Sequence, residues 1–528
     1  MSSLSYQNLD ESEAFGKLQT ISPWDVTQLS PQRLRENTIP VGGELSYCFG
    51  AKSVDDSTLR LLSELAREQQ CIEKYRALAG GAVMNTGESR MVLHHLCRGV
   101  LEKEVSVDGK NLREFYEEQR KRFGEFASRV HSGVVTAPNG EKFEAVVQIG
   151  IGGSDLGPRA LYLALEHLAR SEGFGPKLHA SFVSNVDPDD PASVIRQVDL
   201  RRTLFVLVSK SGTTQETLTN EAFVIQALAK AGVPEKEARR QIVVVTSETS
   251  PLAGNDSYLN GFYFDDYIGG RYSSSSAVGG AILSLAFGPE IFEELLEGAH
   301  DADRRALSDD PLKNAALLDA LIGVYERNIL DYPATAVLPY SQALHRFPAH
   351  LQQLDMESNG KSVNREGEPI AYSTGPLVFG EPGTNGQHSF YQLLHQGTDV
   401  IPLQFIGFRE SQMGEDIEYQ GSSSQTKLNA NLAAQIVAFA RGKKDADPNR
   451  SFAGGRPSSV IVGGRLTPKS LGALLAHFEN KVMFQGFLWN INSFDQEGVQ
   501  LGKVLTKEVL GGKADAVLAE AAKLFGIV

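Results

Sequence analysis

From residue 145 onward, short runs of apolar residues alternate with segments in which apolar positions recur at helical spacing. The first run, Ala145–Gly150, leads into a glycine turn and then into the helical pattern of Ala160–Leu165. Further apolar runs occupy Ala180–Val183, Leu204–Val208 and Ile242–Val245. Because strands that alternate with helices pair in parallel, this pattern predicts a parallel, doubly wound sheet.

A second, weaker series of apolar runs follows. It comprises Ala336–Leu338, Pro376–Phe379 and Val400–Phe405, with a helical pattern over Ser389–His395. The apolar run Ala277–Phe287 is too short and its surroundings too polar for a membrane span, so we interpret it as a buried helix. Arg441–Pro457 is charged and rich in turn residues, which is typical of a solvated loop.

The predicted fold class is therefore α/β, with two doubly wound parallel-sheet domains and helical additions. Residues before about Gly99 are expected to be mostly helical, since Leu61, Leu62, Leu65 and Ala66 form an apolar stripe. A length of 528 residues also favours more than one domain. The expected boundaries are a helical segment at 1–110 that packs on the larger domain, a smaller α/β domain at 111–288, and a larger one at 289–528.

The amino-acid composition limits which binding partners and which cellular compartment we expect. A net charge of −14 argues against a general nucleic-acid binder, and it means that an anionic ligand needs a local positive site. Cys48, Cys71 and Cys97 form an odd set without a C-x-x-C pair, so a reducing compartment fits better than a disulfide framework. The first residues have neither a basic start nor an apolar core, so no signal peptide is expected. We expect a cytoplasmic protein with no membrane and no nucleic-acid partner.

Two glycine motifs resemble nucleotide-binding loops but lack required positions. In Gly150–Gly157 the third glycine of a dinucleotide fingerprint would fall at Asp155. This turn alone leaves tight packing and ligand contact equally open. Gly360-Lys361-Ser362 resembles the end of an ATP-binding loop, but the first glycine of that motif is replaced by Asp355. Neither NAD nor ATP is predicted, and no cofactor is expected.

A cluster of hydroxyl groups lies where an apolar run gives way to a helix. It reads Ser209-Lys210-Ser211-Gly212-Thr213-Thr214, and the helix is predicted to begin near Gln215. A single Ser or Thr here would most simply cap the helix. Four hydroxyls around a glycine exceed that need, whereas a phosphate has several oxygens to satisfy and is attracted by a helix N-terminus. The cluster therefore predicts a phosphate site.

Acid/base chemistry is suggested by a polar, glycine-rich region that contains Glu357 and His388. Taken singly, a solvated glutamate and a structural histidine are the commoner interpretations. Arg271, after two glycines, is more often a surface turn, but it could stabilise a developing negative charge. Lys503 alone carries little weight. The run His94–Cys97 is interpreted as helix packing, and no metal site is predicted.

Beyond these individual motifs, the sequence resembles the glucose-6-phosphate isomerase family over nearly its whole length. The order and number of the matching blocks make chance agreement implausible. The blocks are Asn85–Arg90, Ile149–Pro158, Ser184–Asp187, Ser209–Thr217, Gly269–Ser273, Leu338–Lys361, Gly383–Gly397 and Trp489–Lys503.

The resemblance implies sugar-isomerase-type domains, a sugar-phosphate substrate and a homodimer with shared active sites. It implies that Glu357 moves a proton between C1 and C2, that His388 and Lys503 assist ring opening, and that Arg271 steadies a cis-enediolate. It also implies a set of substrate-binding residues. These are Gly153, Ser154, Ser209, Lys210, Ser211, Thr214, Glu216, Gly270 and Gln496.

Two other functions stay open from the sequence. A non-catalytic sugar-phosphate sensor could share the fold and the hydroxyl cluster. An amino-sugar isomerase or another aldose–ketose isomerase could share the chemistry. One local departure from the family is Ser274-Ser275, where many relatives have bulkier apolar residues, and this leaves the local packing open.

Overall fold

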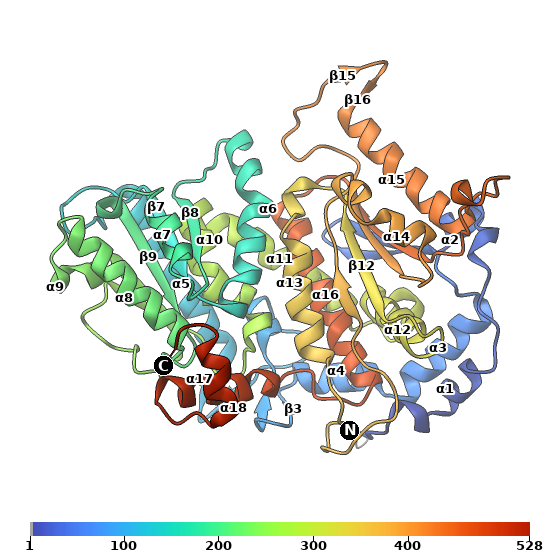
Figure 1. Ribbon diagram of the computed structural model, residues 1–528, viewed down its shortest axis with the longest axis horizontal. Helices are drawn as coiled ribbons and strands as arrows, with labels where there is room; N and C mark the ends of the chain where they lie inside the picture. The colour runs from blue at the N-terminus through green and yellow to red at the C-terminus, as the bar shows by residue number, and fades with distance from the viewer. Residues whose placement is uncertain (1–3, 528) are drawn as a thin grey trace.

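The computed structural model describes residues 4–527 and contains two large sheets flanked by helices, besides three two-stranded hairpins (Figure 1). The first sheet has five parallel strands in the order β11-β10-β9-β7-β8. Its strands are β7 (Ala145–Ile149), β8 (His179–Val183), β9 (Thr203–Val208), β10 (Ile242–Thr246) and β11 (Asn260–Tyr263). The first four confirm the predicted strands. β11 was not predicted, because it is a short edge strand whose first two residues, Asn260 and Gly261, are not apolar strand formers.

The strands of this sheet are buried on both faces. In β9 the side chains of Leu204 and Val206 join the central hydrophobic cluster, whereas Phe205 and Leu207 join a second cluster on the opposite face. A strand covered on both sides reads as a continuous apolar run, which explains why the sequence pattern was so clear here. The helices that follow these strands include α6 (Leu156–Glu172), α7 (Asp189–Ile195) and α8 (Gln215–Lys230).

The second sheet has six strands in the order β1-β2-β17-β14-β12-β13. β12, β13, β14 and β17 run parallel, whereas β2 is antiparallel to β17 and β1 is antiparallel to β2. The bounds are β1 (Thr38–Gly42), β2 (Leu45–Ala51), β12 (Ala334–Pro339), β13 (Leu377–Phe379), β14 (Leu403–Phe408) and β17 (Ser458–Gly463). The α/β fold class is confirmed, but the larger sheet is mixed rather than purely parallel.

Three strands of this sheet were missed by the sequence analysis. β1 contains Pro40 and is partly exposed, and β17 begins with Ser458 and Ser459, so neither forms a clean apolar run. β2 carries Leu45, Tyr47 and Phe49 at alternate positions, a strand pattern that the helical texture around it obscured. The remaining N-terminal elements include four α-helices. These are α1 (Glu13–Leu18), α2 (Pro31–Glu36), α3 (Asp56–Glu68) and α4 (Cys71–Ala79). Among them, α3 carries the apolar stripe that the sequence indicated.

A buried helix lies between the two sheets. α16 (Pro468–Leu488) is buried at nearly every position and packs on α11 (Pro289–Arg305) and α12 (Ala315–Asn328) (Figure 1). The central hydrophobic cluster joins it to both sheets. α10 (Ala277–Phe287) is buried at all its positions, as the sequence predicted. Among the described residues no helix is long and apolar enough to cross a membrane.

Ser274 and Ser275 occupy a tightly packed, buried site. A Cβ on Gly157 would lie 2.0 Å from Ser274 Oγ, and Ser275 Oγ accepts a hydrogen bond from Arg98 Nε at 3.2 Å. The small side chain of Ser274 therefore allows α6 to approach closely at Gly157, and the hydroxyl of Ser275 accepts a hydrogen bond from the buried Arg98. The His94–Cys97 segment forms a short 3₁₀ helix, and the buried ring of His94 stacks on Tyr272, which confirms packing as its role.

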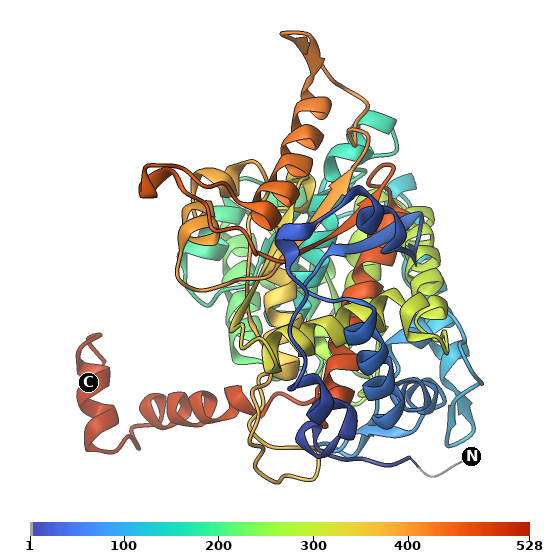
Figure 2. The same cartoon turned by 90° about the vertical axis from the view of Figure 1, so that its right-hand side faces the viewer.

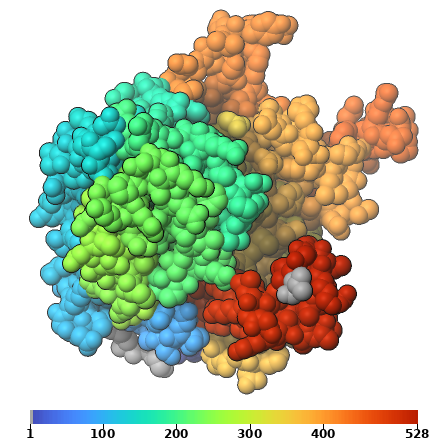
Figure 3. Space-filling view, turned by 60° about the vertical axis from the view of Figure 1, so that its left-hand side comes forward, coloured from blue at the N-terminus to red at the C-terminus, as the bar shows by residue number. Residues whose placement is uncertain are grey.

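Two parts of the chain extend from the body. One comprises the hairpin of β15 (Glu418–Tyr419) and β16 (Ser422–Ser423) with α15 (Ser424–Arg441). The other is a C-terminal arm formed by α17 (Gln500–Leu510) and α18 (Ala516–Lys523), which projects away from the sheets (Figure 2). In the space-filling view this arm forms a separate lobe (Figure 3). Every described residue of these two arm helices is exposed or only partly buried.

Candidate functional site

A cavity of about 800 Å³ opens beside the carboxyl ends of the five-stranded sheet. Ligands in open α/β folds bind at this edge, because the loops that follow parallel strands converge there. The cavity brings together eleven residues that the sequence analysis singled out. They are Gly153, Ser154, Lys210, Ser211, Thr214, Glu216, Gly270, Arg271, Glu357, Gln496 and Lys503.

The hydroxyl cluster lines a recess of about 460 Å³ that shares several walls with this cavity. Ser209 Oγ lies 3.0 Å from Thr214 Oγ1 and accepts a hydrogen bond from the Gly212 N–H at 3.1 Å. Thr214 precedes α8, yet its side chain makes no capping hydrogen bond within the described chain. The capping interpretation therefore fails for Thr214, whose hydroxyl pairs with Ser209 and can form a further hydrogen bond to a ligand.

Lys210 supplies the positive charge at this recess. Its Nζ donates to the carbonyl oxygens of Asp266 and Ile268, both at 3.1 Å, and lies 3.7 Å from Asp266 Oδ1. Burial lowers the pKa of Lys210, and the Asp266 carboxylate opposes that effect. A partly desolvated ammonium held at the end of β9 is well placed to attract an anion in a protein that is acidic overall.

The glycine turn between β7 and α6 packs against the segment that carries Arg271. A Cβ on Gly153 would lie 2.1 Å from the carbonyl carbon of Gly270, so only glycine permits this approach. Both glycines also line the cavity. Of the two interpretations that the sequence left open for this turn, the structure therefore supports tight packing, at a place where the backbone also faces the cavity.

Arg271 is fully buried, and its hydrogen bonds fix the plane of its guanidinium. Nε donates to Ser358 Oγ at 2.7 Å, and Nη2 donates to the carbonyls of Ser493 at 2.7 Å and Asp495 at 2.9 Å. Nη1 donates to Gln496 Oε1 at 3.2 Å. Since a guanidinium has five N–H groups, these four contacts leave one Nη1 donor unused among the described residues.

Glu357 lies next to that remaining donor. It ends a π-helical turn, η10 (Gln353–Glu357), a type of turn that often occurs at functional sites. Its Oε2 lies 3.6 Å from Arg271 Nη1 and accepts no hydrogen bond within the part of the chain that the structure describes. The side chain is 25% exposed. A buried carboxylate oxygen without a donor, at the wall of a cavity, can accept a proton from a bound molecule.

Several polar residues of the cavity were not predicted. Ser247, Thr249 and Ser250 follow β10 and face the same recess as the hydroxyl cluster after β9. Adjacent parallel strands place their following loops together, so this proximity could have been inferred from the strand order. Gln353 lines the cavity one turn before Glu357. Helical spacing relative to Glu357 was the available signal.

His388 lies apart from these residues. It ends a short 3₁₀ helix, η11 (Asn385–His388), is exposed, and is not among the residues that line the cavity of the described chain. The same structure contains no group of three or more His, Cys, Asp or Glu side chains, among those described, that could hold a metal ion.

Comparisons with known proteins place the chain in a family. A family model described as phosphoglucose isomerase matches residues 48–520. The sequence is 58% identical over 517 residues to a glucose-6-phosphate isomerase of Treponema denticola, covering 96% of this chain and 97% of that protein. It is 57% identical over 533 residues to the enzyme of that name from Treponema pallidum (strain Nichols), covering 99% of each.

A solved structure gives the same answer. The crystal structure of a glucose-6-phosphate isomerase from Chlamydia trachomatis is similar, with a TM-score of 0.91 and 42% sequence identity. The match covers 99% of this chain and all of that chain. The sequence blocks, the cavity that they surround and these full-length similarities agree, and the chain belongs to the phosphoglucose isomerase family.

Proposed function

We propose that the protein interconverts glucose 6-phosphate and fructose 6-phosphate, as the names of its relatives indicate for those proteins. One observation carries the proposal. Among residues 4–527, Glu357 presents a carboxylate oxygen that accepts no hydrogen bond, beside an Arg271 N–H that has no acceptor, in a cavity that adjoins a hydroxyl-lined recess. This arrangement suits proton transfer on a phosphorylated, oxygen-rich molecule.

The recess would bind the phosphate group of the substrate. Ser209, Ser211 and Thr214 offer hydroxyl donors, Lys210 offers charge, and the N-terminus of α8 adds a favourable dipole. Because the phosphate is the only strongly charged part of the sugar, its position fixes how the rest of the substrate enters the cavity. Gly153, Ser154, Gly270, Glu216 and Gln496 would then contact the sugar.

The proton would move through Glu357. In the direction from aldose to ketose, its carboxylate removes the proton from C2, the electron pair of that bond forms C1=C2, and the C1 carbonyl electrons move to O1, which gives a cis-enediolate. The carboxylic acid then returns the proton to C1, while the proton of the C2 hydroxyl passes to O1 and the C2 carbonyl forms. The negative charge that develops on oxygen would be stabilised by the free N–H of Arg271, which is already oriented by its other partners. These steps require no metal and no redox cofactor.

Ring opening would use His388 and Lys503. Lys503 lies at the cavity wall on α17, whereas His388 is exposed elsewhere on this chain. We infer a homodimer in which His388 of the partner subunit completes each site. The arm supports this inference, because Leu501, Leu510 and Val517 expose 68%, 63% and 80% of their surface. Apolar side chains displayed together in this way commonly mark a protein interface.

We also infer that the protein is cytoplasmic and acts in glycolysis and gluconeogenesis. Its three cysteines are free thiols buried in the interior. Burial raises the pKa of Cys71 and Cys97 to about 12. Thiols kept in this state fit a reducing compartment.

A coupled assay tests the proposed function. Purified protein is given fructose 6-phosphate, and glucose 6-phosphate is detected through NADP reduction by a glucose-6-phosphate dehydrogenase. Steady production of NADPH that depends on the protein is the expected result. Binding of fructose 6-phosphate without turnover would point to a sensor, and turnover of an amino-sugar phosphate alone would point to a different isomerase. Either of these results overturns the proposal.

A further inference from the structure

The segment 489–496 connects the buried helix α16 to the exposed arm. Its residues are buried as far as Phe494, Asp495 is partly buried, and residues 497–507 are exposed. Asp495 is therefore where the anchored part of this segment ends. Because Lys503 follows on α17, the position of that lysine over the cavity depends on how the chain is held at this point.

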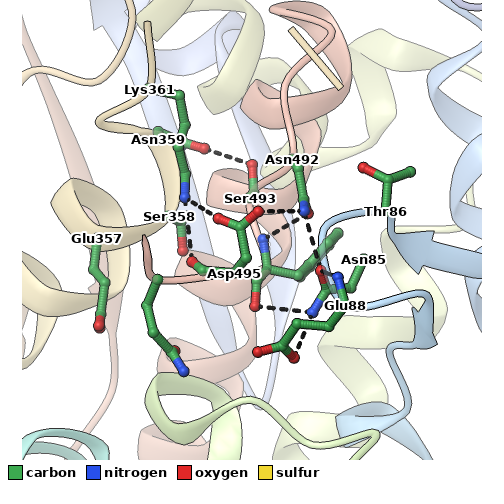
Figure 4. Close-up of polar contacts among 12 residues, drawn as sticks. Asn85, Thr86, Glu88, Glu357, Ser358, Asn359, Lys361, Asn492, Ser493 and Asp495 are labelled. Atoms are coloured by element: carbon green, nitrogen blue, oxygen red, sulfur yellow. Dashed lines mark hydrogen bonds and ion pairs between the residues drawn. The ribbon is translucent and has the colours of Figure 1, made fainter. Parts of the chain in front are cut away.

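Asp495 is held by Lys361, four residues after Glu357 (Figure 4). Lys361 Nζ forms an ion pair with the Asp495 carboxylate and also lies 3.2 Å from the Asp495 carbonyl oxygen. Nearby, Ser493 Oγ donates to Asn359 Oδ1 at 2.7 Å. The residues that follow the proposed base therefore contact the C-terminal segment at both Ser493 and Asp495.

The other oxygen of the same carboxylate is also engaged. Asn492 Nδ2 lies 2.6 Å from Asp495 Oδ2 and 3.0 Å from Asn85 Oδ1, and Asn85 Nδ2 donates to the Phe494 carbonyl at 3.4 Å (Figure 4). The side chains of Lys361 and Asp495 are only 16% and 15% exposed. A partly desolvated ion pair whose carboxylate is bonded on both oxygens holds one geometry far better than an exposed surface pair.

Arg271 connects the Lys361–Asp495 ion pair to the proposed active site. The Asp495 carbonyl accepts a hydrogen bond from Arg271 Nη2, and the next residue, Gln496, accepts one from Arg271 Nη1. We propose that Lys361 and Asp495 form a clip that positions Arg271 and Gln496, and that sets the start of the helix carrying Lys503. Both are positioning residues, and the inference rests on the proposed isomerase function.

Lys361→Met, Asp495→Asn and the double variant test the clip with fructose 6-phosphate as substrate. Misplacement of a reacting group by about 1 Å costs up to about 100-fold in rate, so we expect kcat to fall by at least about tenfold. KM should change by less than about threefold, since the phosphate recess is untouched. The double variant should be no worse than either single one, and Lys361→Arg should restore most of kcat.

A matched control is Lys313→Met, which removes an exposed ion pair with Asp310. It should leave kcat unchanged. Hydrogen exchange of the backbone over 496–503 provides a measurement that does not depend on catalysis, and it should accelerate in the clip variants but not in the control. If the Lys361 variant fails to fold, Asp495→Asn keeps the side-chain shape and decides the question.

The outcomes separate the two proposals. A wild-type protein that does not convert fructose 6-phosphate refutes the proposed function, while the exchange rates still show whether the clip holds 496–503. An active wild type whose folded clip variants keep their kcat and their exchange rates refutes the clip. A lowered thermal midpoint with unchanged kcat likewise refutes it, because that result describes an ion pair that only stabilises the fold.

Discussion

At the scale of single residues, the proposed chemistry depends on how differently two carboxylates of one turn are placed. Glu357 and Asp355 lie two positions apart on η10, yet the first faces the cavity and the second faces the interior. Glu357 keeps an oxygen free beside a guanidinium, whereas Asp355 is enclosed with Asn359 as its hydrogen-bond donor at 3.4 Å. Residues this close in sequence can therefore serve quite different purposes.

Glu357→Gln should abolish the proton transfer while leaving binding largely intact. Glutamine has the same shape but cannot accept the proton from C2, and general-base catalysis is worth about 10²–10⁴-fold in rate. We expect both isomerisation and exchange of the C2 hydrogen with solvent deuterium to fall by this factor. Glu368→Gln, on an exposed loop, is the control. Near-normal exchange in the Glu357 variant would rule out this residue as the base.

Asp355 predicts a dependence of stability on pH. Burial raises its pKa from 3.8 to about 6, although Lys481 and Asn359 act in the opposite direction. The folded state therefore binds the proton more tightly than the unfolded state. The contribution of Asp355 to the free energy of unfolding is fully present below pH 4 and is lost as pH rises through 6. The loss amounts to on the order of 2–3 kcal/mol.

Asp355→Asn removes this penalty, because asparagine stays neutral. The thermal midpoint of the variant should exceed that of the wild type at pH 8, and the difference should shrink toward pH 4.5. A difference that is the same at both pH values would show that Asp355 does not titrate in this range. The side-chain oxygen of the new asparagine can still accept the hydrogen bond from the Asn359 amide, so this contact is preserved.

At the scale of elements, the loop between β9 and α8 concentrates the proposed phosphate contacts. Replacing Ser209, Ser211 and Thr214 together by Ala should raise KM for the sugar phosphate by at least about 100-fold, since hydrogen bonds to a charged group contribute about 1.5–3 kcal/mol each. Steady-state kinetics with fructose 6-phosphate measures this change. The effect on folding should be modest, because Thr214 does not cap the helix and the loop loses mainly the hydrogen bonds that Ser209 and Ser211 accept from the N–H groups of Gly212 and Thr213.

The matched control is Ser30→Ala, which removes a genuine helix cap. Ser30 Oγ accepts a hydrogen bond from the Arg33 N–H at 3.3 Å at the start of α2, far along the chain from the loop. It should lower the thermal midpoint slightly and leave KM unchanged. A folded triple variant with unchanged KM would mean that the hydroxyl cluster does not bind phosphate.

How far the sequence could predict each element depended on how the element is buried. Strands covered on both faces, such as β9, form unbroken apolar runs and were identified. β1 and β17 lie in the larger sheet but contain proline or serine, and β2 lies in a stretch dominated by helices. Their strand character comes from partners distant in the chain, which no local pattern contains.

The same limit applied to the site. Residues in recognisable blocks, such as Glu357 and Arg271, were singled out and lie together in one cavity. Ser247 and Ser250 were missed, because they reach the recess only through the pairing of β9 with β10. The clip between Lys361 and Asp495 joins positions that only the folded chain brings together. The sequence blocks indicated which residues take part in the chemistry, but not which other residues lie beside them in the folded chain.

At the scale of the whole molecule, the proposed dimer predicts complementation between inactive chains. A Glu357→Gln chain and a His388→Ala chain are mixed and allowed to exchange subunits. If each site combines Glu357 with His388 of the partner subunit, one site of every mixed dimer is intact. With random pairing about half the dimers are mixed and half of their sites are whole, so about a quarter of wild-type activity should return.

Native mass spectrometry supplies the check that mixed dimers form. Recovery should follow the fraction of mixed dimers, and either variant incubated alone under the same conditions should stay inactive. Mixed dimers without recovered activity would place both residues in the site of one chain. The exposed position of His388, away from the cavity of its own chain, is the reason to expect recovery instead.

The pairing of β2 with β17 has a consequence for how the protein is made. Ala51 pairs with Ser458, and at ~5–20 residues per second the ribosome needs about 20–80 s for the roughly 400 residues between them. The five-stranded sheet is complete once Tyr263 has been synthesised. The nascent chain can thus complete the five-stranded sheet first, while the edge of β2 that pairs with β17 stays unpaired and open to wrong partners until translation is nearly over.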